Sequence, residues 1–266
     1  MVAYDEGGQL LTGSFMDYGL PRASDLPGLS FESHPVPART NPLGAKGCGE
    51  AGTVGALPAV MSAISDALDS LSLPPAVVGL PPLSVVKPIF GPVMTVKLVA
   101  GKPQHSPRHL CTAAIESAAR GDVIVIEHSS GVECAGWGGV LSVGAQVNGV
   151  EGVVIDGPAR DIDEARALGF PVYGRSPIAR TARGRAYEID FNCEIRIGEV
   201  RVVPGDAVFA DSSGVVFLPA AQIEEIVRRA ARIAERERLM VQALRAGDRI
   251  TEVVGRNYEE MLTKLD

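Results

Sequence analysis

Between residues 56 and 220, short runs of β-branched residues alternate with stretches whose apolar residues recur at helical spacing. The runs are typical of buried strands: VMTVKLV (93–99), VIVIE (123–127), GVVIDG (152–157), VRVV (200–203) and VVFLP (215–219). Helical spacing occurs around them, at 58–70, 108–119, 139–148 and 161–168. Strands that alternate with helices predict an α/β fold with a mainly parallel or mixed sheet.

The two ends of the chain differ from this middle part. Residues from about Ala221 to Ala246 predict one long amphipathic helix, with Pro219 before it and Gly247 after it. Its charged run, RRAARIAERER, is predicted to be a solvated face. The first residues are dense in Pro, Gly, Ser, Asp and Asn, as loops are. We therefore expect an irregular N-terminal arm over residues 1–60 and one folded domain over residues 61–266.

Charge and cysteine content exclude several classes of protein. The chain has 266 residues with 25 basic and 32 acidic side chains, so it lacks the basic surplus of a nucleic-acid binder. No apolar run approaches the ~20 residues that span a bilayer, and the stretch MVAYDEGGQL (1–10) lacks the basic and apolar regions of a secretory signal, so none is expected. The four cysteines form no CxxC pair, which disfavours a zinc knuckle. We expect a reduced, cytoplasmic protein without nucleic-acid or membrane partners.

A glycine-rich turn precedes the helix predicted at 139–148. Gly136, Gly138 and Gly139 stand before VLSVGAQV, and glycines allow close approach of a ligand to the backbone. The free amides of Gly139, Val140 and Leu141 would then attract a carboxylate or phosphate. The same glycines equally suit a tight strand–helix turn that binds nothing. A dinucleotide fingerprint is excluded, because Leu141 stands where the third glycine belongs.

An arginine–aspartate pair follows the strand predicted at 152–157. Arg160 and Asp161 should lie at its carboxyl end, the edge where open α/β sheets bind ligands. Arg160 can hold an oxyanion with two hydrogen bonds, and Asp161 can hold a hydrated divalent cation. Such a pair is more often a surface ion pair of little energetic value. Asp156, inside the strand end, is predicted to be structural.

Other polar residues carry weaker signals. Glu127, His128 and Glu133 follow the strand at 123–127 and are candidates for the same cleft, although a structural role is favoured for His128. His105 and His109 are expected to be capping or surface residues. Asp206 lies in a Pro-Gly-Asp sequence that is ordinary for a turn. No Gly-x-Ser-x-Gly elbow or Cys/His nucleophile pattern is present.

From about Ile64 to Tyr258 the chain resembles the RraA-like family, which includes class II 4-hydroxy-4-methyl-2-oxoglutarate / 4-carboxy-4-hydroxy-2-oxoadipate aldolases and the regulator of ribonuclease E activity A. The matching stretches are ISDALDSL (64–71), GPVMTVKLV (91–99), ARGDVIVIE (119–127), WGGVLSVGAQVNGVEGVVIDGPARD (137–161), GFPVYGR (169–175) and VRVVPGDAVFADSSGVVFLP (200–219). The resemblance implies a swivelling β/β/α domain, a homotrimer or hexamer, and a pyruvate site that uses Mg²⁺ or Mn²⁺.

The resemblance also assigns roles to residues. In the aldolases the Arg contacts substrate oxygens and the Asp holds the metal, and these roles fall on Arg160 and Asp161. The amides that bind the pyruvate carboxylate fall near Val140 and Leu141, after Gly138 and Gly139. The ribonuclease regulator lacks the metal-binding Asp, so Asp161 favours an enzyme. The predicted function is a metal-dependent lyase for small 2-oxo (di)carboxylic acids that works through a metal-stabilised pyruvate enolate, of the aldolase or oxaloacetate decarboxylase type.

One departure from the aldolases concerns proton transfer. They carry an Asp 21 positions before the Arg, and here that position is Gly139. Aldol cleavage needs a group that takes a proton from the substrate hydroxyl, whereas decarboxylation needs only a stabilised enolate. Decarboxylation is therefore less affected by this change. Gln146, His128 and Glu133 are candidates to replace the missing carboxylate.

A second resemblance covers the start of the chain. LTGSFMDYGLPRASDLP (11–27) and TNPLGAKGCGEAGTVGALPAVMSAISDAL (40–68) are similar to the C-terminal end of the molybdenum-binding subunit of the xanthine dehydrogenase family. There the Glu of GEAG, Glu50 here, is the base beside the molybdenum. Most of that subunit is absent, so hydroxylase activity is not expected. Two alternatives to the lyase stay open: a non-catalytic trimeric regulator that binds an enzyme, and a molybdenum hydroxylase fragment fused to an RraA-like domain.

Overall fold

The structure, a computed structural model, describes residues 51–74, 76–102, 108–128 and 130–254. For residues 51–59 it describes the backbone alone. All of these residues belong to one compact unit, residues 48–266. Residues 1–50 of the expected N-terminal arm, Glu50 among them, and His105 lie outside the described residues, whereas residues 51–60 of that arm belong to a helix.

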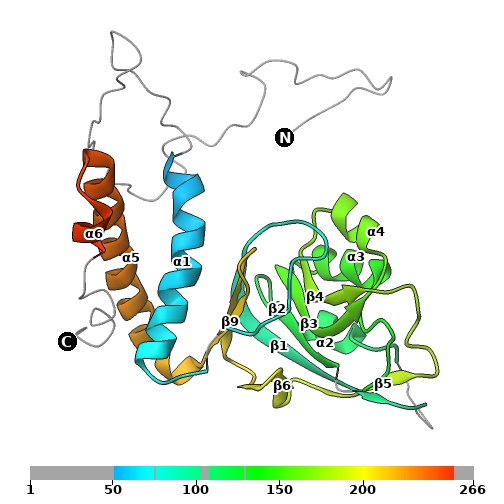
Figure 1. The fold of residues 1–266 in the computed structure, drawn as a ribbon. Helices are drawn as coiled ribbons and strands as arrows, with labels where there is room; N and C mark the ends of the chain where they lie inside the picture. Colours follow the sequence, from blue (N-terminus) through cyan, green and yellow to red (C-terminus); the bar gives the residue numbers. More distant parts are fainter. Residues whose placement is uncertain (1–50, 75, 103–107, 129, 255–266) are drawn as a thin grey trace, which may run out of the picture. The chain divides into compact units, whose positions relative to one another are not determined.

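Helices and strands alternate through the middle of the unit, as expected (Figure 1). The helices are α1 (Ala51–Ser70), α2 (Thr112–Ser117), α3 (Gly139–Val147), α4 (Ile162–Ala167), α5 (Ile223–Ala246) and α6 (Ile250–Val253), with a 3₁₀ turn, η2 (Ala220–Gln222), before α5. The strands are β1 (Ile89–Ala100), β2 (Val123–His128), β3 (Gly152–Ala159), β4 (Val172–Pro177), β5 (Ala186–Phe191), β6 (Ile195–Ile197), β7 (Val200–Val202), β8 (Ala207–Ala210) and β9 (Val215–Leu218).

The main sheet is mixed, with the strand order β4-β3-β2-β1-β8-β9. Strands β1 to β4 run parallel to one another, while β8 pairs antiparallel with the first part of β1 and β9 with β8. Strand β5 pairs antiparallel with the last part of β1, and β6 and β7 form a small separate hairpin. Parallel strands place their carboxyl ends at one edge, so β3 ends where the sequence predicted a ligand site.

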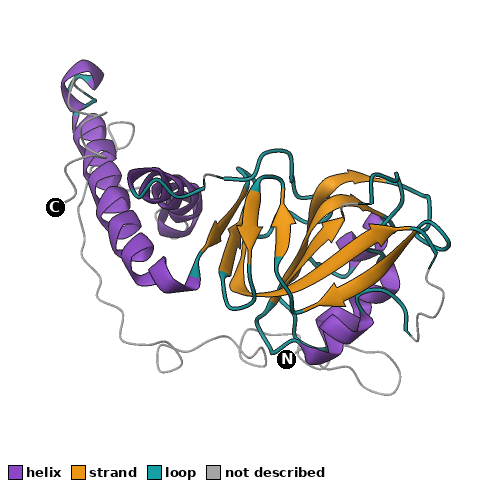
Figure 2. Cartoon of the chain, turned by 90° about the horizontal axis from the view of Figure 1, so that it is seen from below, coloured by secondary structure: helices purple, strands orange, loops and turns teal. Residues whose placement is uncertain are grey.

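The sheet has a core on each face because side chains alternate along its strands. Ile124 and Ile126 of β2 pack with Trp137, Phe170 and residues of α2, α3 and α4. Val123 and Val125, which point the other way, pack with residues of β6, β7, β8 and β9. The result is a β/β/α layering, and the helices of the first core lie along one side of the strands in Figure 2.

Strands β8 and β9 are buried on both faces, and this places the two long helices. Val208 and Phe217 face the second core, whereas Phe209 and Val216 face α1 and α5. From the helices, Leu68 and Ile226 are fully buried in this third core. The amphipathic stripe of α5 is therefore accounted for by α1 and the outer face of β8 and β9.

The predicted fold class is confirmed, including the long C-terminal helix, but several boundaries differ. Gly247 ends α5 in a left-handed conformation with φ 109°, as a terminating glycine should. Helix α2 is shorter than the predicted 108–119, since Cys111 is left-handed and Ala118 is extended. Helix α1 begins seven residues before the predicted start at 58, so Pro58 lies inside it.

Four strands are absent from the sequence prediction: β4, β5, β6 and β8. They are short, and β4 and β5 carry charged or small residues on their exposed halves, so neither shows a clear alternation of apolar and polar residues.

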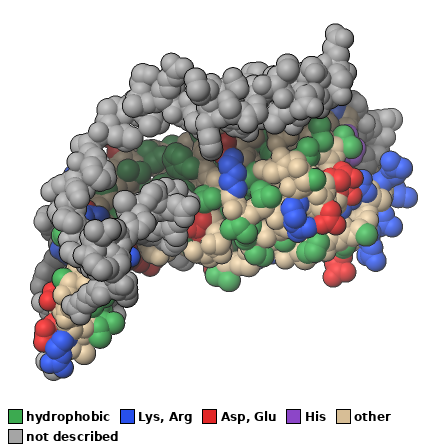
Figure 3. Space-filling view, turned by 90° about the horizontal axis from the view of Figure 1, so that it is seen from above, with side chains coloured by type: hydrophobic (Ala, Val, Ile, Leu, Met, Phe, Trp, Pro, Cys, Tyr) green, Lys and Arg blue, Asp and Glu red, His purple; other side chains and the backbone are tan. Residues whose placement is uncertain are grey.

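In the part of the chain that the structure describes, no helix is long and apolar enough to cross a membrane. On the face shown in Figure 3, Lys and Arg side chains lie next to Asp and Glu side chains.

Asp206 does more than form a turn between β7 and β8. Its side chain is buried, and its carboxylate accepts hydrogen bonds from the N–H groups of Val203, at 2.9 Å, and Ala220, at 3.0 Å. Its carbonyl oxygen accepts the N–H of Val93 at 2.9 Å. The residue thus joins the turn to the start of β1's parallel pairing and to the segment that enters α5.

We expect Asp206→Ala to lower the free energy of unfolding by about 2–4 kcal/mol, since two backbone N–H groups lose their acceptor in a buried place. Urea unfolding followed by circular dichroism measures this change. Asp248→Ala, at an exposed aspartate beyond α5, is the control and should change stability by less than about 0.5 kcal/mol. Equal stabilities of the Asp206 variant and the wild type would contradict the structural role.

Candidate active site

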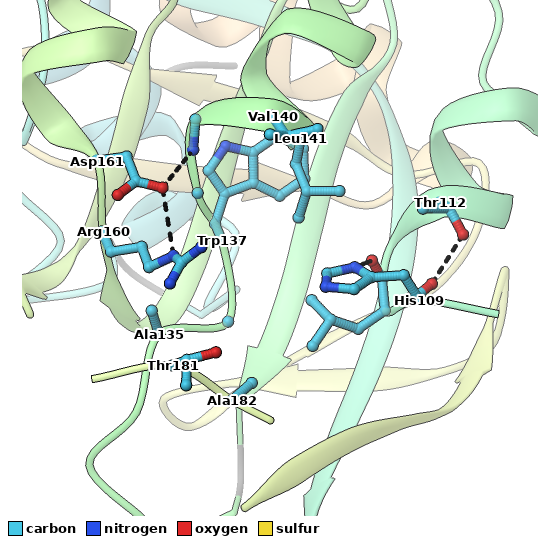
Figure 4. Close-up of a pocket in the computed structure, with 14 residues that line it drawn as sticks. His109, Thr112, Ala135, Trp137, Val140, Leu141, Arg160, Asp161, Thr181 and Ala182 are labelled. Atoms are coloured by element: carbon cyan, nitrogen blue, oxygen red, sulfur yellow. Dashed lines mark hydrogen bonds and ion pairs between the residues drawn. The ribbon is translucent and has the colours of Figure 1, made fainter. Parts of the chain in front are cut away.

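A cavity of about 310 Å³ lies beside the carboxyl end of β3 (Figure 4). Its walls come from residues 109–110, 112, 135–141, 160–161 and 181–182. Among them are all the residues to which the sequence analysis gave catalytic, substrate-binding or metal-binding roles: Gly138, Gly139, Val140, Leu141, Arg160 and Asp161. Strand pairing and helix packing have brought the glycine-rich turn and the Arg–Asp pair into one place.

The glycines of the turn are required by close packing. A Cβ on Gly136 would lie 2.7 Å from both His128 Cδ2 and Ile155 Cδ1. A Cβ on Gly138 would lie 3.0 Å from Asp161 Oδ2. The backbone of Gly138 is extended, with φ −162°, which any residue can adopt. These glycines therefore let the turn approach β3 and the side chains that follow it.

The first turn of α3 presents unpaired amides to the cavity. The N–H groups of Val140 and Leu141 have no acceptor among the described residues, as expected for the start of a helix. The turn is held in place because Trp137 Nε1 donates to Ser142 Oγ at 2.9 Å and Ser142 Oγ donates to the Gly138 carbonyl at 3.2 Å. Two free N–H groups at the positive end of a helix form a suitable cradle for a carboxylate.

Arg160 and Asp161 project from the β3–α4 connection. The Arg160 N–H donates to the Trp137 carbonyl at 3.0 Å, which joins the pair to the glycine-rich turn. Asp161 Oδ2 accepts from the Gly139 N–H at 3.0 Å and lies 3.2 Å from Arg160 Nε. The side chains remain 43% and 33% exposed, so both can reach a ligand. In Figure 4, Arg160 lies between Asp161 and Thr181.

The backbone of Asp161 is left-handed, with φ 55° and ψ 38°. Few residues other than glycine adopt this region, although aspartate and asparagine tolerate it better than most. In this conformation the Asp161 backbone does not continue α4, and its carboxylate lies against the glycine-rich turn. Unusual backbone geometry at a site-lining residue is a common sign of a functional constraint.

Glu164, which the sequence analysis did not name, lies next to the glycine-rich turn although it is not among the cavity-lining residues. A Cβ built on Gly139 would overlap the Glu164 carboxylate and lie 3.2 Å from Asp161 Cβ. The Glu164 carboxylate therefore occupies space that a side chain at position 139 would need. Asp161 precedes α4 in a left-handed conformation, so helical spacing does not link it to Glu164 and offered no signal for this contact.

Asp161 and Glu164 together suit a hydrated divalent cation. Asp161 Oδ1 has no partner among the described residues, so one carboxylate oxygen is available as a ligand. Among those same residues, no group of three or more His, Cys, Asp or Glu side chains is arranged to hold a metal. Mg²⁺ is commonly held by one or two carboxylates and keeps several waters, so this donor set fits it.

The other candidates for the missing carboxylate lie elsewhere. His128 is buried; its Nε2 pairs with the Cys134 carbonyl at 2.9 Å and its Nδ1 with Ser130 Oγ at 3.0 Å. Gln146 donates to the Leu168 carbonyl at 2.9 Å. Neither residue lines the cavity, nor do Glu127 and Glu133. The expectation that Glu127, His128 and Glu133 face this cleft is wrong, because none of them lines the cavity and the first two are buried inside β2.

The remaining predicted residues divide between structure and site. Asp156 is structural as expected, since its carboxylate receives Arg175 Nε at 2.6 Å and the Gly198 N–H at 2.6 Å. His109 lines the cavity, with Nδ1 3.1 Å from the Leu110 carbonyl.

Cys111, close to His109 in the chain, is a buried thiol. Burial raises the pKa of this thiol, and the negative charge of Glu188 raises it further. Cys111 is therefore not a thiolate nucleophile.

Comparisons with known proteins agree on one family. Residues 37–217 match the family described as "RraA-like: Aldolase/RraA". The chain is 28% identical over 189 residues to Protein DlpA of Legionella pneumophila, covering 71% of this chain but only 31% of that protein. It is 31% identical over 167 residues to a Halalkalibacterium halodurans protein named "Putative 4-hydroxy-4-methyl-2-oxoglutarate aldolase", covering 63% of this chain and 76% of that one.

A solved structure agrees with the sequence comparisons. A protein from Pseudomonas syringae pv. tomato has 27% sequence identity and a TM-score of 0.65, and the match covers 75% of this chain and 96% of the other. The family match covers more than half of the chain and includes the glycine-rich turn and the Arg–Asp pair. The chain belongs to the RraA-like family.

Proposed function

We propose that this protein is a divalent-metal-dependent carbon–carbon lyase that acts on small 2-oxo (di)carboxylic acids. The observation that carries the proposal is the meeting, in one cavity, of free helix amides, the Arg160 guanidinium and the Asp161 carboxylate. The first can bind a carboxylate, the second an oxyanion and the third a cation. A 2-oxo acid with a bound metal requires all three.

Binding of the substrate follows from these positions. The carboxylate of the 2-oxo acid accepts hydrogen bonds from the amides of Val140 and Leu141. The adjacent 2-oxo oxygen then faces Arg160, whose guanidinium can donate to it while Nε stays near Asp161. The Trp137 indole forms part of the wall and excludes water from one side of the cavity.

Asp161 and Glu164 are the residues that would hold the metal. When bound there, a divalent cation supplies Lewis-acid polarisation of the 2-oxo group. Glu164 is exposed on the first turn of α4, so it can adjust to the coordination sphere. Mg²⁺ and Mn²⁺ both accept oxygen ligands of this kind.

Decarboxylation of oxaloacetate is the simplest reaction that this site supports. The bond between C3 and C4 breaks, C4 leaves as CO₂, and the electron pair moves through C2 to the 2-oxo oxygen. Arg160 stabilises the negative charge that develops on that oxygen. A proton from water then adds to C3 and gives pyruvate, so no acid–base side chain at position 139 is needed.

Aldol cleavage of a 4-hydroxy-2-oxo acid makes the same enolate by a different bond cleavage. The 4-hydroxyl loses a proton, the bond between C3 and C4 breaks, and a carbonyl compound leaves in place of CO₂. The step needs a proton acceptor near the hydroxyl. Since Gly139 has no side chain, we expect decarboxylation to be faster than aldol cleavage in the natural protein.

Release of pyruvate from oxaloacetate, measured with Mg²⁺ and then with EDTA, tests the proposed function. We expect turnover above the rate of the metal-containing buffer alone and loss of that turnover with EDTA. A protein that shows neither, while folded by circular dichroism, would instead support a non-catalytic member of the family that binds a partner enzyme. As family members are oligomeric, the assay is best run on the homo-oligomer, expected to be a trimer or hexamer.

Gly139→Asp should raise aldol cleavage of a 4-hydroxy-2-oxo diacid relative to oxaloacetate decarboxylation, because it adds a proton acceptor to the site. The φ of Gly139 is not in the left-handed region, so its backbone accepts a side chain. Two obstacles are Asp161 Cβ, 3.2 Å from the new Cβ, and the exposed end of Glu164, which must rotate away. Because Glu164 is one of the two proposed metal ligands, Mn²⁺ binding by the variant is measured as well. The measurement is the ratio of the two rates at saturating Mg²⁺.

The matched control for this substitution is Gly144→Asp, which adds the same side chain on α3, where a Cβ meets only Ile115 Cγ2 at 4.0 Å. It should leave the ratio unchanged. A wild-type protein that already cleaves the diacid faster than it decarboxylates oxaloacetate would contradict the importance of Gly139.

A further inference from the structure

A second chamber adjoins the candidate active site. Its volume is about 350 Å³, and it shares five lining residues with the first: His109, Leu110, Arg160, Thr181 and Ala182. Six residues line the second chamber alone: Arg108, Arg183, Gly184, Ala186, Tyr187 and Glu188. A substrate held at Arg160 can therefore extend along the wall formed by Thr181 and Ala182 into this second space.

Three arginines line the second chamber, and two of them already have acidic partners. Arg108 donates to Glu188 Oε1 at 3.1 and 3.2 Å and stacks over Phe191 at 5.0 Å. Arg160 is near Asp161. The Arg183 side chain has no hydrogen-bond or ion-pair partner in the described part of the chain.

The backbone around Arg183 is held in place. Its N–H donates to Thr181 Oγ1 at 3.3 Å, and the N–H groups of Arg185 and Ala186 donate to the Ala182 carbonyl at 2.7 and 2.9 Å. Ala135 N–H, in the wall of the first chamber, donates to the Arg180 carbonyl at 2.8 Å. The same backbone bonds thus position Arg183 relative to the first chamber, which favours a defined distance between two binding points.

We propose that Arg183 determines substrate specificity by binding a second carboxylate at the far end of the substrate. This inference rests on the proposed function, because it takes the 2-oxo acid end to be bound at Arg160. It concerns acids whose far carboxylate lies beyond the bond that breaks, as in a 4-hydroxy-2-oxo diacid. In oxaloacetate the second carboxylate is itself the leaving CO₂, so that substrate is too short to use this chamber.

Two unreactive inhibitors of equal chain length test the proposal. 2-Oxoadipate carries a carboxylate at its far end, and 2-oxohexanoate has a methyl group there. Inhibition of oxaloacetate decarboxylation by each acid gives two inhibition constants. We expect the wild type to bind 2-oxoadipate about tenfold more tightly than 2-oxohexanoate, the value of one charge-assisted hydrogen-bonded pair.

Arg183→Gln should remove this preference, and Arg183→Lys should keep part of it because the positive charge remains. Arg180→Gln is the matched control: it makes the same charge change in the same loop, but Arg180 lines neither chamber. The control should keep the tenfold preference. A preference that survives Arg183→Gln, or one absent from the wild type, would overturn the proposal.

The experiment separates this proposal from the proposed function. If the wild type does not decarboxylate oxaloacetate, the proposed reaction fails, and calorimetric titration of the same two acids in Mg²⁺ still measures the preference. If oxaloacetate is turned over but both acids bind equally, the reaction stands and the role of Arg183 fails.

Discussion

Asp161→Ala is expected to abolish the metal-dependent decarboxylation of oxaloacetate. Asp161 lines the cavity, and its Oδ1 has no partner among the described residues. Within that part of the chain its removal leaves Glu164 as the carboxylate beside the turn. One exposed carboxylate binds Mg²⁺ weakly. The rate of pyruvate release should fall to that of metal-containing buffer without protein. Titration with Mn²⁺ should show that the variant has lost the metal site at Asp161.

The alanine variant also alters the backbone and the turn, so a second variant is needed. Alanine in the left-handed region costs about 1 kcal/mol, and the Gly139 N–H loses its acceptor. Asp161→Asn tolerates the same φ and keeps an oxygen for that N–H while losing the charge. It should melt near the wild-type temperature and still lose metal binding and activity. Full activity in either variant would exclude Asp161 as a metal ligand.

Arg160→Ala is expected to lower turnover by about 10²–10³, while the affinity for oxaloacetate changes much less. The negative charge on the 2-oxo oxygen develops as the C3–C4 bond breaks, and a donor directed at that charge acts mainly in the transition state. The measurement is the separate determination of kcat and KM at saturating Mg²⁺.

Two further variants make the Arg160 result specific. Arg160→Lys should recover only part of the loss, because an ammonium cannot reproduce the planar fork of a guanidinium. Arg166→Ala removes an exposed arginine of α4 that pairs with Asp163 and lines neither chamber, so it should leave kcat unchanged. A rise in KM with unchanged kcat in Arg160→Ala would show that Arg160 binds the ground state only.

The parts of the fold that were predictable from sequence are those with a local pattern. Buried parallel strands such as VIVIE read as continuous β-branched runs, and α5 shows helical periodicity with a proline before it and a glycine after it. The position of Arg160 and Asp161 at the end of β3 followed from the same reasoning, because a Gly-Pro pair ends the apolar run. The glycine-rich turn before α3 was also visible, as three glycines within four residues permit close backbone contact.

Only the tertiary structure decided which of these groups meet. Gly139 and Glu164 are 25 positions apart in the sequence. Nothing along the chain indicates that the Glu164 carboxylate fills the space beside the Gly139 backbone. Likewise, the joining of Arg183 to the active site depends on the pairing of the 178–182 segment with Ala135 and Ala159. Local pattern is set by the interaction of near neighbours in the chain, whereas a site is set by strand order and helix packing. Those depend on how the whole core is filled, so the sequence determined the elements and the tertiary structure determined the chemistry between them.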